Sequence, residues 1–104
     1  MIKVIEGYKM GDMTDISELQ SILAKLGPGI LPLSGYIASE VLLSVKDSSI
    51  ICLQSNWESI DKWRTWEESY IRGGLYQQIS PFLVEDPRVS TYQIYKIASS
   101  QIWG

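Results

Sequence analysis

The chain has 104 residues, of which 45% are hydrophobic and 20% charged, and its formal net charge is −3. This length and composition indicate one globular domain, spanning residues 1–104, that can bury a core without disulfides or metal. The acidic balance argues against a nucleic-acid partner, and the absence of histidine excludes Ser–His and Cys–His catalytic pairs, histidine-ligated zinc and a histidine-ligated haem.

Two further features of the sequence indicate where the protein is located in the cell. The single Cys52 lies within an apolar run, where a thiol usually behaves as a small inert hydrophobe, and it cannot form an internal disulfide. The start of the chain lacks an apolar leader, and no stretch approaches the roughly 20 apolar residues of a membrane span. We therefore expect a soluble cytoplasmic protein without a membrane partner.

The first half of the chain predicts a strand, a helix and a hairpin. Residues 2–9 alternate loosely between apolar and polar and predict a strand. Residues 14–26 carry apolar side chains at helical spacing and end at Gly27-Pro28-Gly29, so they predict a helix. Two strands, over residues 35–45 and 49–57, follow around a polar turn. The drier face of the first of these strands is expected to consist of Ile37, Val41, Leu43 and Val45.

A tryptophan-rich segment predicts the second helix, over residues 59–72. Ser59 is suited to cap its first turn, and Gly73-Gly74 is expected to end it. The predicted inner face consists of Ile60, Trp63, Glu67 and Tyr70, with Trp66 beside it. Trp63 is expected in the core, whereas Trp66 suits either the core or the edge of a pocket. A short helix over residues 75–79 and a last strand over residues 88–97 follow.

The order of these elements, βαββαβ, predicts an α+β fold of the ferredoxin-like type, an antiparallel four-stranded sheet with two helices on one face. The helices can cover only one face of the sheet, yet both faces of the second and third strands carry apolar side chains. We therefore expect a homodimer in which a second copy covers the helix-free face. The apolar Gln101-Ile102-Trp103 tail is expected to add to that interface.

The sequence resembles the antibiotic biosynthesis monooxygenase (ABM) superfamily, the dimeric α+β barrel proteins, over nearly its whole length. The residues that carry the resemblance are Ser34-Gly35-Tyr36, Glu40, Asn56-Trp57-Glu58-Ser59 leading into Trp63 and Trp66, and Pro81-Phe82. The resemblance implies a small homodimer with a pocket between sheet and helices in each subunit. The family includes cofactor-independent oxygenases that convert phenols to quinones, haem-degrading oxygenases, and proteins with no known reaction.

The haem-degrading members carry an Asn on the first strand, a Trp on the helix and a haem-ligating His ten residues after that Trp. Here Trp66 matches the Trp, but Tyr76 stands at the His position, and the first strand offers Glu6-Gly7-Tyr8 without Asn. Tyrosine can ligate haem iron, so haem binding stays open as an alternative, while haem oxygenation of that type is disfavoured. No cofactor is expected.

Several side chains are therefore candidates for a pocket that takes a small aromatic ligand. The candidate catalytic residues are Asn56, Trp66, Tyr70 and Tyr76, and the candidate ligand-binding residues are Tyr36, Trp63 and Arg72. An amide can stabilise an oxyanion, and tyrosine or arginine can bind a phenolate. Each group also has a structural explanation: strand-end capping for the amide, packing for the aromatic rings and a surface ion pair for the arginine.

Three functions fit this pattern. The first is a cofactor-independent monooxygenase for a small electron-rich aromatic, whose anion itself reduces dioxygen. The second is a non-catalytic dimer that binds a small ligand in the same pocket, and the third is a dimer whose pocket is vestigial. The sequence does not separate the first two, because a pocket for a phenol has the same composition in both.

Overall fold

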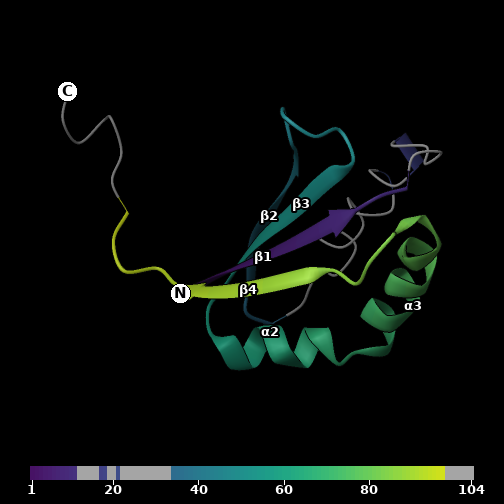
Figure 1. The fold of residues 1–104 in the computed structure, drawn as a ribbon. Coiled ribbons are helices and arrows are strands. Elements are labelled where there is room, and N and C mark those ends of the chain that lie inside the picture. Colours follow the sequence, from purple (N-terminus) through teal and green to yellow (C-terminus); the bar gives the residue numbers. More distant parts are fainter. Residues whose placement is uncertain (12–16, 19–20, 22–33, 98–104) are drawn as a thin grey trace.

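The structure is a computed structural model, and it describes residues 1–11, 17–18, 21 and 34–97 (Figure 1). The elements in this part of the chain are β1 (Ile2–Lys9), β2 (Tyr36–Leu43), β3 (Ile50–Trp57), α2 (Ile60–Glu67), α3 (Tyr70–Ile79), the 3-10 turn η2 (Ser80–Phe82) and β4 (Arg88–Gln93). The predicted helix over residues 14–26 falls mostly outside the described residues, although Ser17, Glu18 and Ser21 are helical. None of the described helices is long and apolar enough to cross a membrane.

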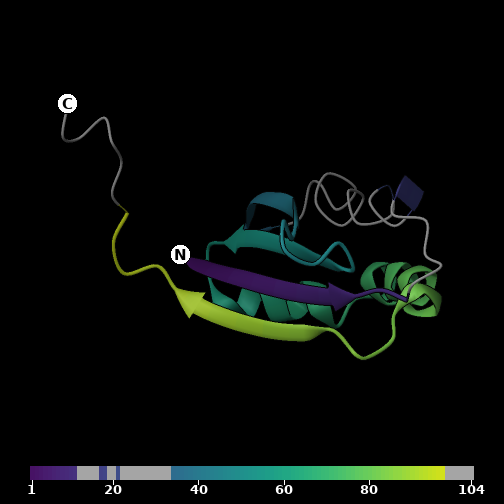
Figure 2. The same cartoon turned by 45° about the horizontal axis from the view of Figure 1, so that its top comes forward.

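The strands form one antiparallel sheet in the order β2-β3-β1-β4. Strand β1 occupies an inner position, pairing with β3 from Ile2↔Trp57 to Lys9↔Ile50 and with β4 from Ile2↔Gln93 to Gly7↔Arg88. Helices α2 and α3 both lie on the same side of this sheet (Figures 1 and 2). The predicted ferredoxin-like α+β fold is confirmed.

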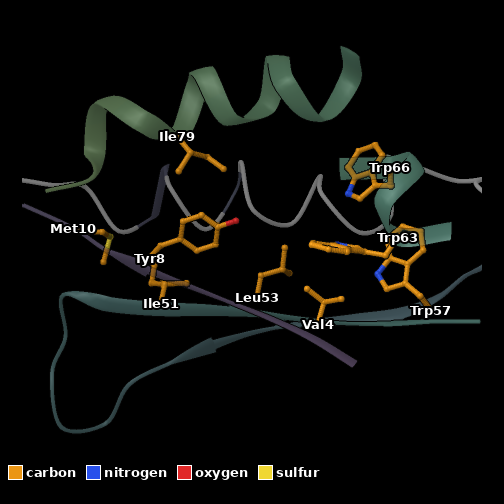
Figure 3. Close-up of a cluster of buried hydrophobic side chains, with 9 residues drawn as sticks. All are labelled: Val4, Tyr8, Met10, Ile51, Leu53, Trp57, Trp63, Trp66 and Ile79. Carbon is orange, nitrogen blue, oxygen red and sulfur yellow. The ribbon is translucent and has the colours of Figure 1, made fainter. Parts of the chain in front are cut away.

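Alternation along β1 and β3 determines which side chains meet the helices. Every second residue of each strand is buried, with the pattern continuing from β1 into Met10, because successive side chains point to opposite faces of the sheet. The resulting core, shown in Figure 3, consists of Val4, Tyr8, Met10, Ile51, Leu53, Trp57, Trp63, Trp66 and Ile79. Trp63 lies in the core as predicted, and Trp66 is only 5% exposed.

A register shift at the start of β2 changes the face predicted for Tyr36 and Ile37, whereas Val41, which pairs with the buried Leu53, keeps its predicted face. Tyr36 pairs with Trp57 and Ala38 with Asn56, so Ile37 is an extra residue at a bulge. Tyr36 consequently lies on the helix side, with its ring 5.4 Å from that of Trp57 in an edge-to-face arrangement. The expectation that Ile37 lies on the drier face is wrong, since its side chain is exposed. Val45, beyond the end of the strand, is also exposed.

The predicted helix over residues 59–72 is two helices. Ser59 caps α2 as predicted, accepting the Lys62 N–H at 3.3 Å. The chain then leaves helical geometry at Ser69, which is extended (φ −75°, ψ 154°) and caps α3 by accepting the Arg72 N–H at 3.2 Å. The predicted break at Gly73-Gly74 is wrong, because both glycines lie within α3. Figure 1 shows α2 and α3 running in different directions.

The last strand is shorter than the predicted 88–97. Pairing with β1 ends at Gln93, and the Ile94 N–H donates to the Met1 carbonyl at 3.0 Å. Residues 94–97 then continue away from the sheet (Figures 1 and 2), with Tyr95 almost fully exposed. The Gln101-Ile102-Trp103 tail lies outside the described residues.

A glycine turn attaches the start of β2 to α2. Gly35 has φ +87°, and its carbonyl accepts the Glu58 N–H at 2.8 Å. A Cβ at this position would lie 2.5 Å from both Cβ and Cγ of Lys62. The Lys62 Nζ also donates to the Ser34 hydroxyl at 3.0 Å. Only glycine satisfies both the backbone conformation and this close approach.

We expect Gly35→Ala to lower the free energy of unfolding by about 1–3 kcal/mol, because it adds left-handed strain and a clash with a Cβ that cannot rotate away. Gly73→Ala is the matched control: no described atom lies within 4 Å of the added Cβ, and the site is an exposed helix interior. That change should stabilise by about 0.5–1 kcal/mol. Urea denaturation measures both effects, and equal stability of the two variants would contradict this account of the turn.

Candidate functional site

A buried polar cluster lies between the sheet and α3. Glu6 on β1 is only 3% exposed, and each of its carboxylate oxygens has a partner. The Tyr8 hydroxyl donates to Oε2 at 2.8 Å, and Nη2 of Arg72 donates to Oε1 at 3.0 Å. The Arg72 side chain is 18% exposed, so this ion pair extends from the interior toward the surface.

Local sequence accounts for the placement of all three residues. Glu6 and Tyr8 are two apart on β1, so both point to the helix side of the sheet. The Ser69 cap fixes the start of α3 and hence the position of Arg72. The end of that helical segment is joined to the end of β1 by the Gly11 N–H donating to the Phe82 carbonyl at 3.1 Å.

The electrostatics of the cluster are those of a shielded anion. An isolated carboxylate in an apolar interior costs several kcal/mol, so Glu6 requires the Arg72 charge and both hydrogen bonds. Burial raises the pKa of Tyr8 well above its ordinary value, and the neighbouring Glu6 charge and hydrogen bond raise it further. The positive charge of Arg72 lowers the pKa of Tyr8, but this effect is smaller than the effects that raise it. Tyr8 is therefore a neutral hydrogen-bond donor across the accessible pH range.

Three tryptophans and several aliphatic side chains occupy the rest of this layer. Figure 3 shows the Tyr8 hydroxyl pointing along the layer in the direction of Trp57, Trp63 and Trp66, with Leu53 and Val4 on the sheet below. The Trp57 indole N–H is satisfied by the Ser55 hydroxyl at 3.0 Å. Large aromatic surfaces together with a few placed polar groups are typical of sites for small molecules.

A surface groove of about 370 Å³ lies at the C-terminal end of α3. Its lining includes Tyr76, Ser80 and Leu83. Tyr76 lies one helical turn after Arg72, on the same face of α3. Tyr76 thus lies on the Arg72 face of α3 and lines the open groove.

The structure brings together some of the candidate residues and separates others. Tyr36, Trp63, Trp66, Arg72 and Tyr76 all lie on the helix side of the sheet. Their roles in binding or catalysis stay predictions.

Two candidates do not converge with the others. Tyr70 is 100% exposed, because the break at Ser69 turns the first residue of α3 away from the face extrapolated from α2. Asn56 lies on the opposite face of the sheet, since it alternates with the buried Trp57 and pairs with Lys3. The expectation that these two residues line a common pocket with Trp66 is wrong.

Sequence reasoning did not include Glu6 and Tyr8 among the candidates. The signal was present as a carboxylate at the inward position of a strand whose neighbouring inward residues are Val4 and Tyr8. A charge at such a position is almost never buried without a partner. Arg72 is that partner, and its ion pair is internal rather than on the surface.

Comparisons with known proteins show the fold. No protein-family model and no curated protein matches the chain. A solved antibiotic biosynthesis monooxygenase is 14% identical with a TM-score of 0.79, and the match covers 92% of this chain and 100% of that one. SnoaB, a cofactor-independent oxygenase from Streptomyces nogalater, is 8% identical with a TM-score of 0.80, covering 92% and 94%. A Deinococcus radiodurans protein, provisionally assigned as an antibiotic biosynthesis monooxygenase, is 10% identical with a TM-score of 0.82, covering 95% and 97%. The resemblance indicated by the sequence is confirmed for the fold.

The raised pKa of Tyr8 predicts how stability depends on alkaline pH. In the unfolded chain this tyrosine ionises near pH 10, whereas in the folded protein it stays neutral, so its stabilising contribution is complete below pH ~10 and is lost as pH rises above that value. Tyr8→Phe has no proton to release and should show a shallower loss of stability above pH ~10. Urea denaturation between neutral and alkaline pH measures the two slopes, and parallel slopes would contradict the assignment.

Proposed function

We propose that this chain, which has the fold of the antibiotic biosynthesis monooxygenase superfamily, is a cofactor-independent monooxygenase. Its substrate would be a small electron-rich aromatic of the phenol or quinol type, bound between the sheet and the helices. The observation that carries the proposal is the buried Glu6–Tyr8–Arg72 cluster in an otherwise apolar layer that contains three tryptophans. A cationic group in an apolar aromatic layer suits an aromatic anion.

In the proposed reaction the substrate anion itself supplies electrons to dioxygen. The protein then has three tasks: to hold the ring, to stabilise the negative charge and to exclude bulk water. Trp63 and Trp66 present apolar aromatic surface for the first and third tasks. Arg72 carries a permanent positive charge at the border between the buried cluster and the surface, which suits the second.

The alternative is a non-catalytic dimer that binds a small ligand. Tyr8 is 2% exposed and Trp66 only 5% exposed, so this layer has the burial of an ordinary core, which favours a protein without turnover. Side chains so well covered also serve as ordinary core. The two functions differ in whether dioxygen is consumed, not in which residues surround the ligand.

We further propose a homodimer in which the helix-free face of the sheet is the interface. This face carries exposed or half-exposed Leu42, Ile5 and Tyr92, and a groove of about 670 Å³ lined in part by Asn56. The Asn56 Oδ1 atom is buried, and among the described residues it has no hydrogen-bond partner.

Oxygen uptake tests the catalytic proposal. Purified protein should be colourless and should oxidise at least one member of a hydroquinone and anthrone panel faster than buffer does. Trp66→Phe should lower that rate about tenfold or more, because it changes the surface that orients the ring. Thr65→Ser, at the adjacent exposed position of α2, is the control that should retain the rate. Binding of an unreactive phenol without oxygen uptake across the panel would favour the binding protein instead.

Sedimentation tests the dimer. Wild-type protein should sediment as a dimer at micromolar concentration, and Tyr92→Glu should shift it toward monomer by placing a charge in the apolar contact. Tyr70→Glu introduces the same charge at a fully exposed position on the helix side and should remain dimeric. A monomeric wild-type protein, or the same oligomeric state in the two variants, would contradict this assignment of the interface.

A further inference from the structure

A cation lies in the middle of the helix-free face of the sheet. Among the residues of the inner strands β1 and β3, all of them described, Lys3 is the only charged side chain on this face apart from Lys9 at the end of β1. Lys3 is half-buried, and it pairs with Asn56 on one side and with Tyr92 on the other. It also lines the groove of about 670 Å³ on this face. Within the described part of the chain it has no ion-pair partner.

The four strands, whose residues are all described, place one carboxylate on the same face. Glu40 of β2 pairs with Gln54 of β3, which alternates with the buried Leu53, so Glu40 and Gln54 both point away from the helices. Glu40 is exposed and has no ion-pair partner among the described residues. The other charge that the outer strands carry is Arg88, which lies 3.8 Å from Glu85.

The helix side of the sheet shows how this fold satisfies a charge on an inner strand. Glu6 faces the helix layer, and Arg72 reaches it from α3. Lys3 faces the opposite direction, and α2 and α3 both lie on the far side of the sheet from it (Figure 2). A second copy that covers the helix-free face without a carboxylate would bury this ammonium unpaired, at a large cost in free energy.

We propose that the second copy supplies this carboxylate, with Lys3 of each subunit paired with Glu40 of the partner subunit. The inference rests on the homodimer proposed above and names the charges that orient it. In a two-fold contact residue i meets residue j and j meets i, so one pairing rule gives two ion pairs per dimer. Each subunit thereby satisfies the charge on its own inner strand and that of its partner.

The pairing determines how the two sheets are placed on each other. Strand β3 separates Lys3 from Glu40, so the backbones of β1 and β2 are about 10 Å apart, and the two side chains form no ion pair within the subunit. Their neighbours on the face include the uncharged Ile5, Leu42 and Cys52, which pack in several registers equally well. A register that brings like charges together is disfavoured, so the two charges select one arrangement.

Charge reversal tests the pair. Lys3→Glu and Glu40→Lys should each raise the dissociation constant of the dimer about 10²-fold or more, because each creates two contacts between like charges. An equimolar mixture of the two variants should form a heterodimer, since both contacts then join opposite charges. The double variant, with both reversals in one chain, should dimerise as wild type does. Sedimentation measures the dissociation constants, and native mass spectrometry with one variant isotope-labelled identifies the heterodimer.

Two control variants change the net charge by the same amounts elsewhere. Lys46→Glu lies in the turn between β2 and β3, and Glu68→Lys lies at the end of α2, both at exposed positions. Both should dimerise as wild type. Circular dichroism establishes that each variant is folded. If a reversal does not fold, Lys3→Gln and Glu40→Gln form a double-mutant cycle in which the second change adds little to the loss caused by the first.

The outcomes separate the pair from the dimer. A wild-type dimer that both reversals leave intact, or losses that are additive in the cycle, would overturn the pair while the dimer stands. Weakened variants that form no heterodimer on mixing would overturn it as well. A dimer that inorganic phosphate strengthens at constant ionic strength, with Glu40→Gln behaving as wild type, would assign Lys3 to a bound anion instead. A monomeric wild-type protein would overturn the homodimer and the pair together.

Discussion

The buried carboxylate of Glu6 is the constraint on which the rest of the structure depends. Strand β1 is an inner strand of the sheet, so a charge on its helix side has no route to bulk water along the sheet edge. It requires a cation that approaches from the helix layer, and Arg72 supplies it. The start of α3 at Ser69, which sets the position of Arg72, follows from that requirement as much as from helix propensity.

The same constraint explains why α3 is tied down at both ends. The Ser69 cap fixes its first turn, and hydrogen bonds between β1 and the η2 region fix its far end, with the Val84 N–H donating to the Lys9 carbonyl at 3.0 Å. These contacts position Arg72 beside Glu6. Buried ion pairs add little net stability compared with well-packed apolar residues, so a function for the pair is the more economical account of its presence.

Much of the fold follows from the sequence by simple periodicity. The hairpin of β2 and β3 and the Ser59 cap were predictable because alternation and capping are local signals. The break at Ser69 was not, because serine is tolerated within helices and two glycines a few residues later provide a stronger apparent stop. The bulge at Ile37 was not predictable either. One extra residue changes the face occupied by the residues before it without changing the composition of the strand.

The candidate site was only partly predictable, for physical reasons that differ from residue to residue. The buried positions of Trp63 and Trp66 follow from helical spacing. The position predicted for Tyr70 does not hold, because the helix breaks at Ser69. Asn56 was assigned to the interior although strand alternation with the buried Trp57 places it on the other face. Glu6 was read as a departure from a family pattern, whereas its inward position on β1 gives it the central place.

The two faces of the sheet therefore have separate proposed tasks, with aromatic chemistry on the helix side and subunit contact on the other. The most direct test of the central claim replaces the ion pair as a whole, by Glu6→Met together with Arg72→Met. Our account predicts that this double variant unfolds with a free energy within about 1–2 kcal/mol of wild type, because an apolar pair of similar volume can replace a buried ion pair. It also predicts that the variant no longer consumes dioxygen with hydroquinones. A double variant that retains the oxygen uptake of wild type would contradict the claim that this ion pair is present for function.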